Sequence, residues 1–312
     1  MPLTAADHLR HDIDGQFARE SVAYCLILPE HGLMGHWYTW VNEAGVGGRA
    51  FVLHGAGPDP IFFDHRDGLT VGSQDFDDWN LDGAVLRVGE PLRTAQARFE
   101  STDLAVEFTF EGIHPAFDYG SNAGGTPGYL AQNRYEQTGR IAGELRWGGE
   151  TYAFDGPGHR DHSWGTRDWD AIHHYKWIAA SGEDCSANLM WTMAEGEVDV
   201  NGYLFVDGLQ SPVARASITT DYGDAFVQDV VRAEIVDEAG RSTALDLDTR
   251  HTLARWDVSP TFNFSDTMFT GRLAGHEVRA YVEYTWPRAY LDHLLAREDR
   301  AGIDQGRAVH AG

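Results

Sequence analysis

Apolar and polar side chains alternate with a period of two residues along most of this 312-residue chain. The stretch 104–112 shows the pattern plainly, because Leu104, Val106, Phe108 and Phe110 are separated by small or polar residues. Successive side chains of a β-strand point to opposite faces, so this spacing produces one apolar face and one mixed face. The pattern therefore restricts most of the chain to a fold built from half-buried strands.

Turn signals rich in Gly, Pro and Asn separate the apolar runs at roughly 8–12-residue intervals, which are typical of sandwiches and barrels. Helical patterns are confined to residues 5–20 and, after Pro287, to residues 288–300. We therefore predict an all-β fold with a short C-terminal helix. The predicted strands are residues 21–28, 33–41, 49–54, 84–89, 92–100, 104–112, 140–147, 151–155, 187–193, 202–206, 227–237, 242–248, 263–273 and 278–286.

A short repeat divides the chain into two similar halves. Gly-Arg-Ile-Ala-Gly at residues 139–143 recurs as Gly-Arg-Leu-Ala-Gly at residues 271–275. Two β units in tandem are the simplest explanation, and a chance match over so short a segment is the alternative. Residues 115–136 are rich in Gly, Pro and Tyr and are interpreted as an insertion that forms a lid or mouth over a cavity. We expect domains at residues 1–155 and 156–312.

Composition limits the partners of the protein. The net charge of −24 and the pI near 4.8 oppose binding to nucleic acid or to an anionic membrane surface. No apolar run is long enough to span a membrane and no secretory leader is visible, so we expect a cytoplasmic protein. Cys25 and Cys185 lack metal or redox spacing and are expected to be buried thiols. The sequence leaves a homodimer open.

Aromatic residues make up 12% of the chain and include ten Trp. They fit either a large cavity for an apolar or π-rich ligand or an aromatic-filled β core. The ligand predicted on this basis is a hydrophobic small molecule.

The densest group of chemically active side chains lies in residues 158–169, which read Gly-His-Arg-Asp-His-Ser-Trp-Gly-Thr-Arg-Asp-Trp and show neither a helical nor an alternating pattern. A carboxylic acid buried among apolar groups has a raised pKa and holds its proton near neutral pH. Asp161 could therefore act as a general acid, with His162 as the partner base or the group that orients water. Gly156, Gly158 and Gly165 are expected to let the backbone turn sharply.

Aromatic rings near this segment could surround a developing carbocation with their π faces. The residues assigned to substrate binding for this reason are Trp164, Trp169, Tyr175, Trp177 and Trp191. A core-packing role is the alternative for Trp164.

A purely structural role is the main alternative for the charged residues of this segment. Arg160, Asp161, Arg167 and Asp168 could form a buried ion-pair network that locks the two β units together. The two roles are compatible, because such a network would lie beside the cavity.

A metal site is a weaker alternative, built from the neighbouring residues His159, Asp161, His162, His173 and His174. On a strand, His159 and Asp161 share a face while His162 points away. No established zinc-ligand spacing is present, so we expect no metal and no other cofactor. The hydrolase motif Gly-x-Ser-x-Gly is absent, and the Gly-rich runs at 45–48 and 55–57 are interpreted as turns.

Residues 158–165 and the Arg-Asp-Trp run at 167–169 resemble the Asp-His-x-Trp-Gly signature of the carotenoid 1,2-hydratase and AttH-like families. The Glu-Gln-x-Gly-Arg-x-x-Gly segment at 136–143 fits the same group. The residues that match the marker itself are Asp161, His162, Trp164 and Gly165. The resemblance implies two tandem lipocalin-like antiparallel barrels or sandwiches around a largely apolar cavity. His159 belongs to this branch of the group and is assigned to substrate binding.

The resemblance also implies a class of reaction. Members of these families add water to isolated alkenes, eliminate it, or cyclise polyenes without a redox cofactor. The implied function is a cofactor-independent lyase, meaning a hydratase, dehydratase or cyclase, that acts on a hydrophobic terpenoid or aromatic small molecule. Two alternatives stay open: a non-catalytic carrier of a hydrophobic ligand, and an isomerase or pericyclase on the same fold.

Overall fold

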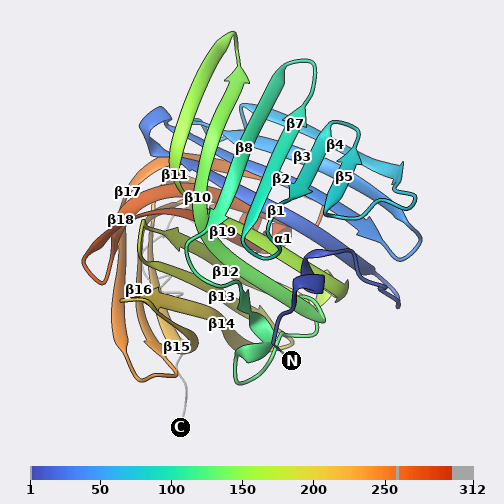
Figure 1. The fold of residues 1–312 in the computed structure, drawn as a ribbon. Helices are drawn as coiled ribbons and strands as arrows, with labels where there is room; N and C mark the ends of the chain where they lie inside the picture. The colour runs from blue at the N-terminus through green and yellow to red at the C-terminus, as the bar shows by residue number, and fades with distance from the viewer. Residues whose placement is uncertain (1, 258–259, 297–312) are drawn as a thin grey trace. The chain divides into compact units, whose positions relative to one another are not determined.

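The computed structural model describes residues 2–257 and 260–296, and this part of the chain divides into two compact units (Figure 1). Unit 1 holds the residues up to Leu53 together with Phe62–Trp169, and unit 2 holds His54–Ile61 together with the residues from Asp170 onward. The strand Glu150–Thr166 runs through position 155, so the expected boundary between residues 155 and 156 falls inside a strand of unit 1. Unit 1 therefore keeps the whole of the 158–168 segment.

Unit 1 is a single sheet of eleven strands. The path through the sheet is β4-β3-β2-β1-β11-β10-β8-β7-β6-β5, and β9 pairs with β10. Because the first strand lies beside the last, β11 is held between two long strands, β1 and β10. The strands are β1 (Ala18–Leu28), β2 (Leu33–Asn42), β3 (Val46–His54), β4 (Phe62–Thr70), β5 (Asp78–Leu81), β6 (Ala84–Val88), β7 (Thr94–Glu100), β8 (Leu104–Gly112), β9 (Phe117–Asp118), β10 (Asn133–Trp147) and β11 (Glu150–Thr166), with short 3-10 helices η1 (Ala5–His8), η2 (Pro29–His31) and η3 (Tyr119–Ser121).

Large aromatic side chains fill the core of unit 1. Phe51, Phe76, Trp79, Phe99 and Phe108 are fully buried. The ring centroids of Phe76 and Trp79 lie 4.7 Å apart, and those of Phe51 and Phe99 lie 5.3 Å apart. Such ring pairs contribute about 0.5–1.5 kcal/mol beyond the burial of their area. Packing within the sheet therefore accounts for a good part of the aromatic content of this half of the chain.

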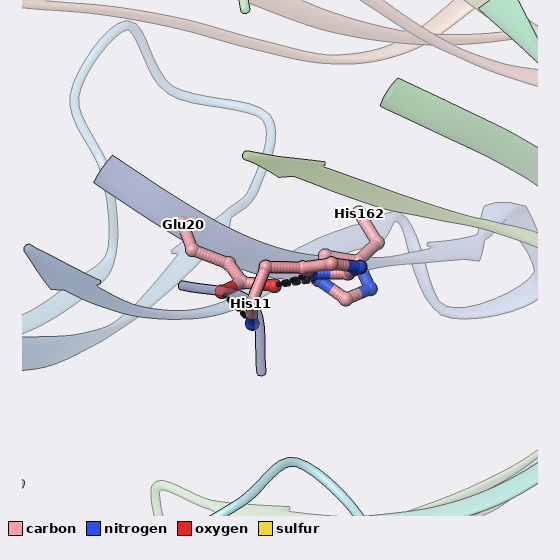
Figure 2. A group of neighbouring side chains, drawn as sticks. All are labelled: His11, Glu20 and His162. Carbon is pink, nitrogen blue, oxygen red and sulfur yellow. Dashed lines mark hydrogen bonds and ion pairs between the residues drawn. The ribbon is translucent and has the colours of Figure 1, made fainter. Parts of the chain in front are cut away.

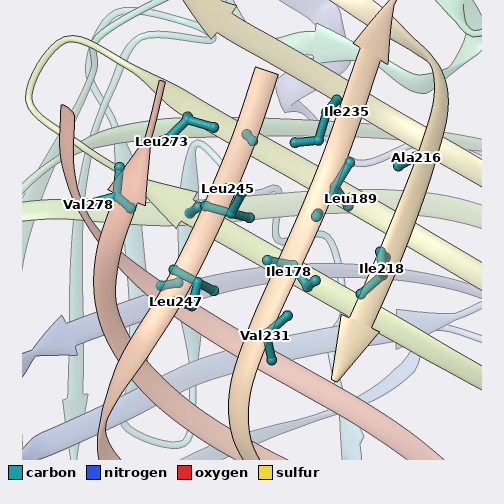
Figure 3. Packing of buried hydrophobic residues seen from close by; sticks show 14 of the residues in the cluster. Ile178, Leu189, Ala216, Ile218, Val231, Ile235, Leu245, Leu247, Leu273 and Val278 are labelled. Atoms are coloured by element: carbon teal, nitrogen blue, oxygen red, sulfur yellow. The ribbon is translucent and has the colours of Figure 1, made fainter. Parts of the chain in front are cut away.

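Unit 2 is a closed barrel in which each of eight strands pairs with the next and β19 pairs back with β12. Aliphatic side chains from alternate positions fill its interior, and Figure 3 shows them meeting between the strands. Closure leaves the barrel without an exposed edge. The elements are η4 (Trp169–Ala171), β12 (Ile172–Ser181), β13 (Ser186–Ala194), β14 (Glu197–Val206), β15 (Leu209–Tyr222), η5 (Asp224–Phe226), β16 (Gln228–Asp237), β17 (Ser242–Asp257), β18 (Phe262–Leu273), β19 (His276–Pro287) and α1 (Arg288–Leu295).

The all-β prediction is confirmed, and so is the C-terminal helix. Helix α1 packs Leu291 and Leu294 against Trp286 and Phe226, and the predicted part of the helix beyond residue 296 lies outside the described residues. The predicted N-terminal helix is reduced to the four residues of η1. Among the described residues, no helix is long and apolar enough to cross a membrane.

Two other sequence features, the short repeat and the predicted insertion, lie at structural positions that differ from those expected. Residues 139–143 lie in the middle of β10, whereas residues 271–275 form the end of β18 and the following turn, so the short repeat does not mark equivalent positions. The predicted insertion 115–136 is folded against the sheet, because it contains β9 and η3 and its last residues already belong to β10.

Candidate functional site

Strand β11 carries most of the residues singled out by the sequence, and it is buried on both sides. Every residue from Gly156 to Gly165 is buried. A strand with one solvent face alternates apolar and polar residues, whereas a strand covered on both faces has no such requirement. The missing alternation in residues 158–169 thus reflects a central strand rather than a loop. Only Gly165 has a left-handed φ, of 107°, so the expected sharp turns at Gly156 and Gly158 are wrong.

The alternation of the strand sorts its side chains between two faces, which we name by the parity of the β11 residues. The odd face holds Ser21 from β1, Arg134, Glu136 and Thr138 from β10, and His159, Asp161 and Ser163 from β11. The even face holds Glu20 from β1, Tyr135 from β10, and Arg160, His162 and Trp164 from β11. Asp161 and His162 therefore point in opposite directions.

One guanidinium on the odd face serves two carboxyl groups. Arg134 Nε donates to Glu136 Oε1 at 2.7 Å, and Arg134 Nη2 forms ion pairs with both Glu136 and Asp161. All three side chains are buried. Two ionised carboxylates on one guanidinium would leave a net negative charge away from water, which is unfavourable. The arrangement therefore favours one ionised and one protonated carboxyl.

His159 decides which of the two carboxyls stays ionised. Its Nε2 bonds to Glu136 Oε2, and its Nδ1 lies 3.2 Å from Thr138 Oγ1. Burial by itself raises the pKa of Glu136, but Arg134 and His159 together outweigh burial and lower the pKa below its usual value. Burial raises the pKa of Asp161 to about 6, although Arg134 acts in the opposite direction. Asp161 is thus the carboxyl that takes up a proton most readily.

A hydroxyl group connects Asp161 to a second arginine. Ser163 Oγ donates to Asp161 Oδ1 at 3.3 Å. Arg167 Nη2 donates to Ser163 Oγ at 2.8 Å and to Ser21 Oγ at 2.7 Å. The odd face is therefore a continuous polar region that extends from His159 to Arg167.

The even face holds a hydrogen-bonded group of His11, Glu20 and His162 (Figure 2). Glu20 Oε1 lies 2.7 Å from His11 Nδ1 and 2.7 Å from His162 Nε2, and Glu20 Oε2 accepts from the His11 backbone N–H at 2.8 Å. Tyr135 Oη lies 3.2 Å from His162 Nδ1. Burial lowers the pKa of His162, so its neutral ring can accept from Tyr135 and donate to Glu20.

The same three side chains are one of two groups among the described residues that could hold a metal ion. The ligand atoms of His11, Glu20 and His162 all lie within 4.8 Å of one another, as do those of Asp184, Cys185 and His276. Two imidazoles and a carboxylate suit Zn²⁺ and other transition metals. The hydrogen bonds of the first group also satisfy its polar atoms without an ion.

Neutral and aromatic partners surround the other even-face residues. The Trp164 ring stacks on His11 with 3.9 Å between centroids and 4° between planes. Arg160 donates from Nε and Nη2 to Gln137 Oε1, at 2.9 and 2.6 Å. Arg160 thus binds an amide, Arg167 binds hydroxyls and Asp168 is exposed, and the expected network of these three residues stays a prediction. A buried ion-pair network exists, with Arg134 at its centre.

The aromatic residues assigned to substrate binding lie in both units. In unit 2, Trp191 points into the barrel core beside Ile178, whereas Tyr175 and Trp177 alternate with that core and point away from it. Tyr175 donates to Glu283, and Trp177 contacts the Tyr281 ring at 5.5 Å. The side chain of Trp169 lies outside the described residues.

Sequence reasoning missed four of the charged and imidazole side chains of this site. Arg134 and Glu136 lie on β10, and His11 and Glu20 lie in or before β1. A sequence signal existed for β10, because the charged residues Arg134 and Glu136 lie between Tyr129 and the strand predicted at residues 140–147. No comparable signal marks His11 or Glu20, because several other acidic residues and histidines lie near the N-terminus.

Fold and site together define a class: an all-β protein of two barrel-like units with a buried polar cluster on a central strand. The chain belongs to the DUF7064 family, a domain of unknown function, over residues 4–288. A comparison with curated proteins finds no match.

Two solved structures place the fold among known ones. CghA in its crystal structure with Sch210972 shares 14% identity over 87% of this chain and 89% of CghA, with a TM-score of 0.61. A proposed AttH from Nitrosomonas europaea shares 16% identity over 86% of this chain and 91% of its own, with a TM-score of 0.61. At these identities the likeness shows the fold alone. It agrees with the all-β fold of two units that the resemblance implies, and the relation to the AttH-like and carotenoid hydratase families stays a prediction.

Proposed function

We propose that this protein is an enzyme in which Asp161 acts as a general acid on a hydrophobic small molecule, as a cofactor-independent lyase of the hydratase or dehydratase kind. The observation that carries the proposal is the competition of Glu136 and Asp161 for Arg134. Since Glu136 has His159 as a second partner, Asp161 is the carboxyl with the raised pKa, at about 6. A carboxyl of this kind keeps a proton that it can donate near neutral pH.

The proposed reaction begins with the transfer of one proton. Transfer from the Asp161 carboxyl to an alkene carbon forms a C–H bond and leaves a carbocation and a carboxylate. Arg134, already in contact with Asp161, balances the new negative charge. Water then adds to the cation and loses a proton to the carboxylate, which restores the acid. The reverse order of steps is a dehydration, and neither direction needs an electron donor or acceptor.

The proposal changes the role given to the neighbouring histidines. His162 lies on the even face and does not pair with Asp161, so the histidine beside the acid is His159. His159 acts as a positioning residue, because it holds Glu136 ionised and so leaves Asp161 to carry the proton. The aromatic side chains assigned to substrate binding stay predictions. The fold is compatible with small-molecule binding, since CghA was crystallised with Sch210972.

The test is turnover by purified, ligand-stripped protein incubated with alkene-containing terpenoids in water enriched in heavy oxygen. A hydratase gives a product that contains solvent oxygen, whereas an isomerase or pericyclase gives a product without it. Saturable binding with no product over long incubation identifies a carrier. Full turnover by the Asp161→Asn variant would overturn the acid assignment.

A further inference from the structure

Arg167 is a buried cation that forms no ion pair with a carboxylate in the part of the chain that the structure describes. It is 7% exposed, and its described hydrogen bonds go to Ser21 and Ser163. Within residues 2–257 and 260–296, it forms no ion pair with a carboxylate, and its Nε–H has no hydrogen-bond acceptor. A guanidinium removed from water is unfavourable unless an opposite charge compensates it. Arg167 thus has hydrogen-bonding capacity and charge that the described chain does not use.

Arg19 is a second, half-buried arginine on the neighbouring strand. It lies two residues before Ser21 on β1, so both side chains belong to the odd face. Its guanidinium lies 4.4 Å from the Trp40 ring centroid and 5.4 Å from the Tyr38 ring centroid. Among the described residues it forms no direct ion pair with a carboxylate, although Asp67 acts to raise its pKa, and its Nε–H also lacks an acceptor.

Arg19 and Arg167 both lower the pKa of the same side chain, Tyr38. Burial by itself raises the pKa of the Tyr38 hydroxyl, but Arg19 and Arg167 outweigh burial and lower it. A half-buried phenol whose pKa falls, although burial by itself would raise it, lies in a positive field. Arg134 forms ion pairs with two carboxyls, so Arg19 and Arg167 are the arginines of the odd face that, among the described residues, form no ion pair with a carboxylate.

We propose that Arg19 and Arg167, beside the hydroxyls of Ser21 and Ser163, bind the carboxylate of an otherwise apolar small molecule. Guanidinium groups match the planar, two-oxygen geometry of a carboxylate. A multiply charged anion is less suitable, because the protein carries a net charge of −24. The rings of Trp40 and Tyr38 provide apolar surface next to the charged groups.

This site deepens the proposed function, on which it rests for the chemistry beside it. Ser163 accepts from Arg167 and donates to Asp161, so the bound carboxylate would lie about one hydroxyl group away from the acid. The substrate class named by the geometry is therefore an unsaturated, hydrophobic carboxylic acid. A carboxylate at this position would also favour the protonated form of Asp161.

The experiment measures binding without turnover, by calorimetry, with dodecanoate, methyl dodecanoate and inorganic phosphate as probes. The variants are Arg167→Gln, Arg19→Gln and, as a matched control, Arg140→Gln, which alters an exposed arginine paired with Asp155. We expect saturable binding of dodecanoate that each of the first two variants weakens roughly tenfold or more, because a charged hydrogen bond is lost. The control should bind dodecanoate as the unaltered protein does.

A second measurement separates ligand binding from a structural role. Thermal unfolding of Arg167→Gln without ligand should show an unchanged or higher Tm, since the variant removes a buried charge that forms no direct ion pair. A lower Tm with unchanged dodecanoate affinity overturns the proposal. Equal binding of acid and methyl ester overturns it too, and so does a preference for phosphate or an absence of saturable binding. If Arg167→Gln does not fold, Arg19→Gln decides between these outcomes. If an inactive Asp161→Asn variant still binds dodecanoate, the carboxylate site is independent of the acid chemistry of Asp161.

Discussion

The two faces of β11 use the same kinds of side chain and differ in how their charges are matched. On the even face, Glu20 is bonded to His11 and His162, and these partners outweigh burial and lower its pKa. On the odd face, Asp161 shares its arginine with Glu136, and burial raises its pKa. Two buried carboxyls thus show opposite pKa shifts. The number of partners available to each carboxyl accounts for the difference between the two faces.

The largest effect that sharpens this contrast is expected from Asp161→Asn. An amide of the same shape cannot donate a proton to carbon, so we expect turnover to fall by about 10²–10⁴-fold, the range for loss of a general acid. The rate of product formation at saturating substrate measures it. The matched control is Asp155→Asn on the same strand, an exposed residue paired with Arg140. Equal losses in both variants would contradict a special role for Asp161.

The next largest effect is on stability and comes from Arg134→Met. The change leaves Glu136 and Asp161 buried without their shared cation, so we expect a loss of about 3–5 kcal/mol in the free energy of unfolding. Urea unfolding followed by circular dichroism measures it. The exposed pair Arg140–Asp155 on the same two strands provides the comparison, since Arg140→Ala should cost only about 0.2–1 kcal/mol. A similar cost for both variants would mean that Arg134 is not the centre of the network.

A smaller, pH-dependent effect separates Asp161 from the carboxyls with lowered pKa. Its folded pKa of about 6 lies above the reference value of 3.8. Its contribution to stability is therefore fully present below about pH 4 and is lost as the pH rises through about 6. The unfolding free energy of the unaltered protein minus that of Asp161→Asn should fall across this window and then level off. A difference that rises with pH would show that Asp161 is a stabilised carboxylate instead.

The sequence predicted the architecture better than the site, for a physical reason. Alternation along a strand is local, so residues such as Leu104 and Phe108 reveal their strand directly. The partners of a buried side chain depend on strand order instead. Glu20 reaches His162 across 142 residues of sequence only because β1 lies beside β11. Nothing in the periodicity of either segment specifies that neighbour.

The motif on β11 was recognised as chemically important, yet its internal pairings were not. Asp161 and His162 are adjacent in sequence and therefore on opposite faces of a strand. The alternation rule alone already separates His159 and Asp161 from His162, and the register confirms that separation. The ion pair of Asp161 formed instead with Arg134, which lies on the same face of the adjacent strand, whereas Arg160 lies on the opposite face of β11.

The smallest effect tests whether the even face is structural, as its matched charges indicate. Tyr135→Phe removes the hydroxyl beside His162 Nδ1 and leaves the ring in place. We expect a loss of about 0.5–1.5 kcal/mol in the free energy of unfolding, the usual net contribution of one hydrogen bond. The change in turnover, expressed as an activation free energy, should be smaller than this loss of stability, because the hydroxyl points away from Asp161. Urea unfolding and product formation on the same preparation measure both quantities. A large fall in turnover with little change in stability would move the chemistry to the even face and reverse the comparison.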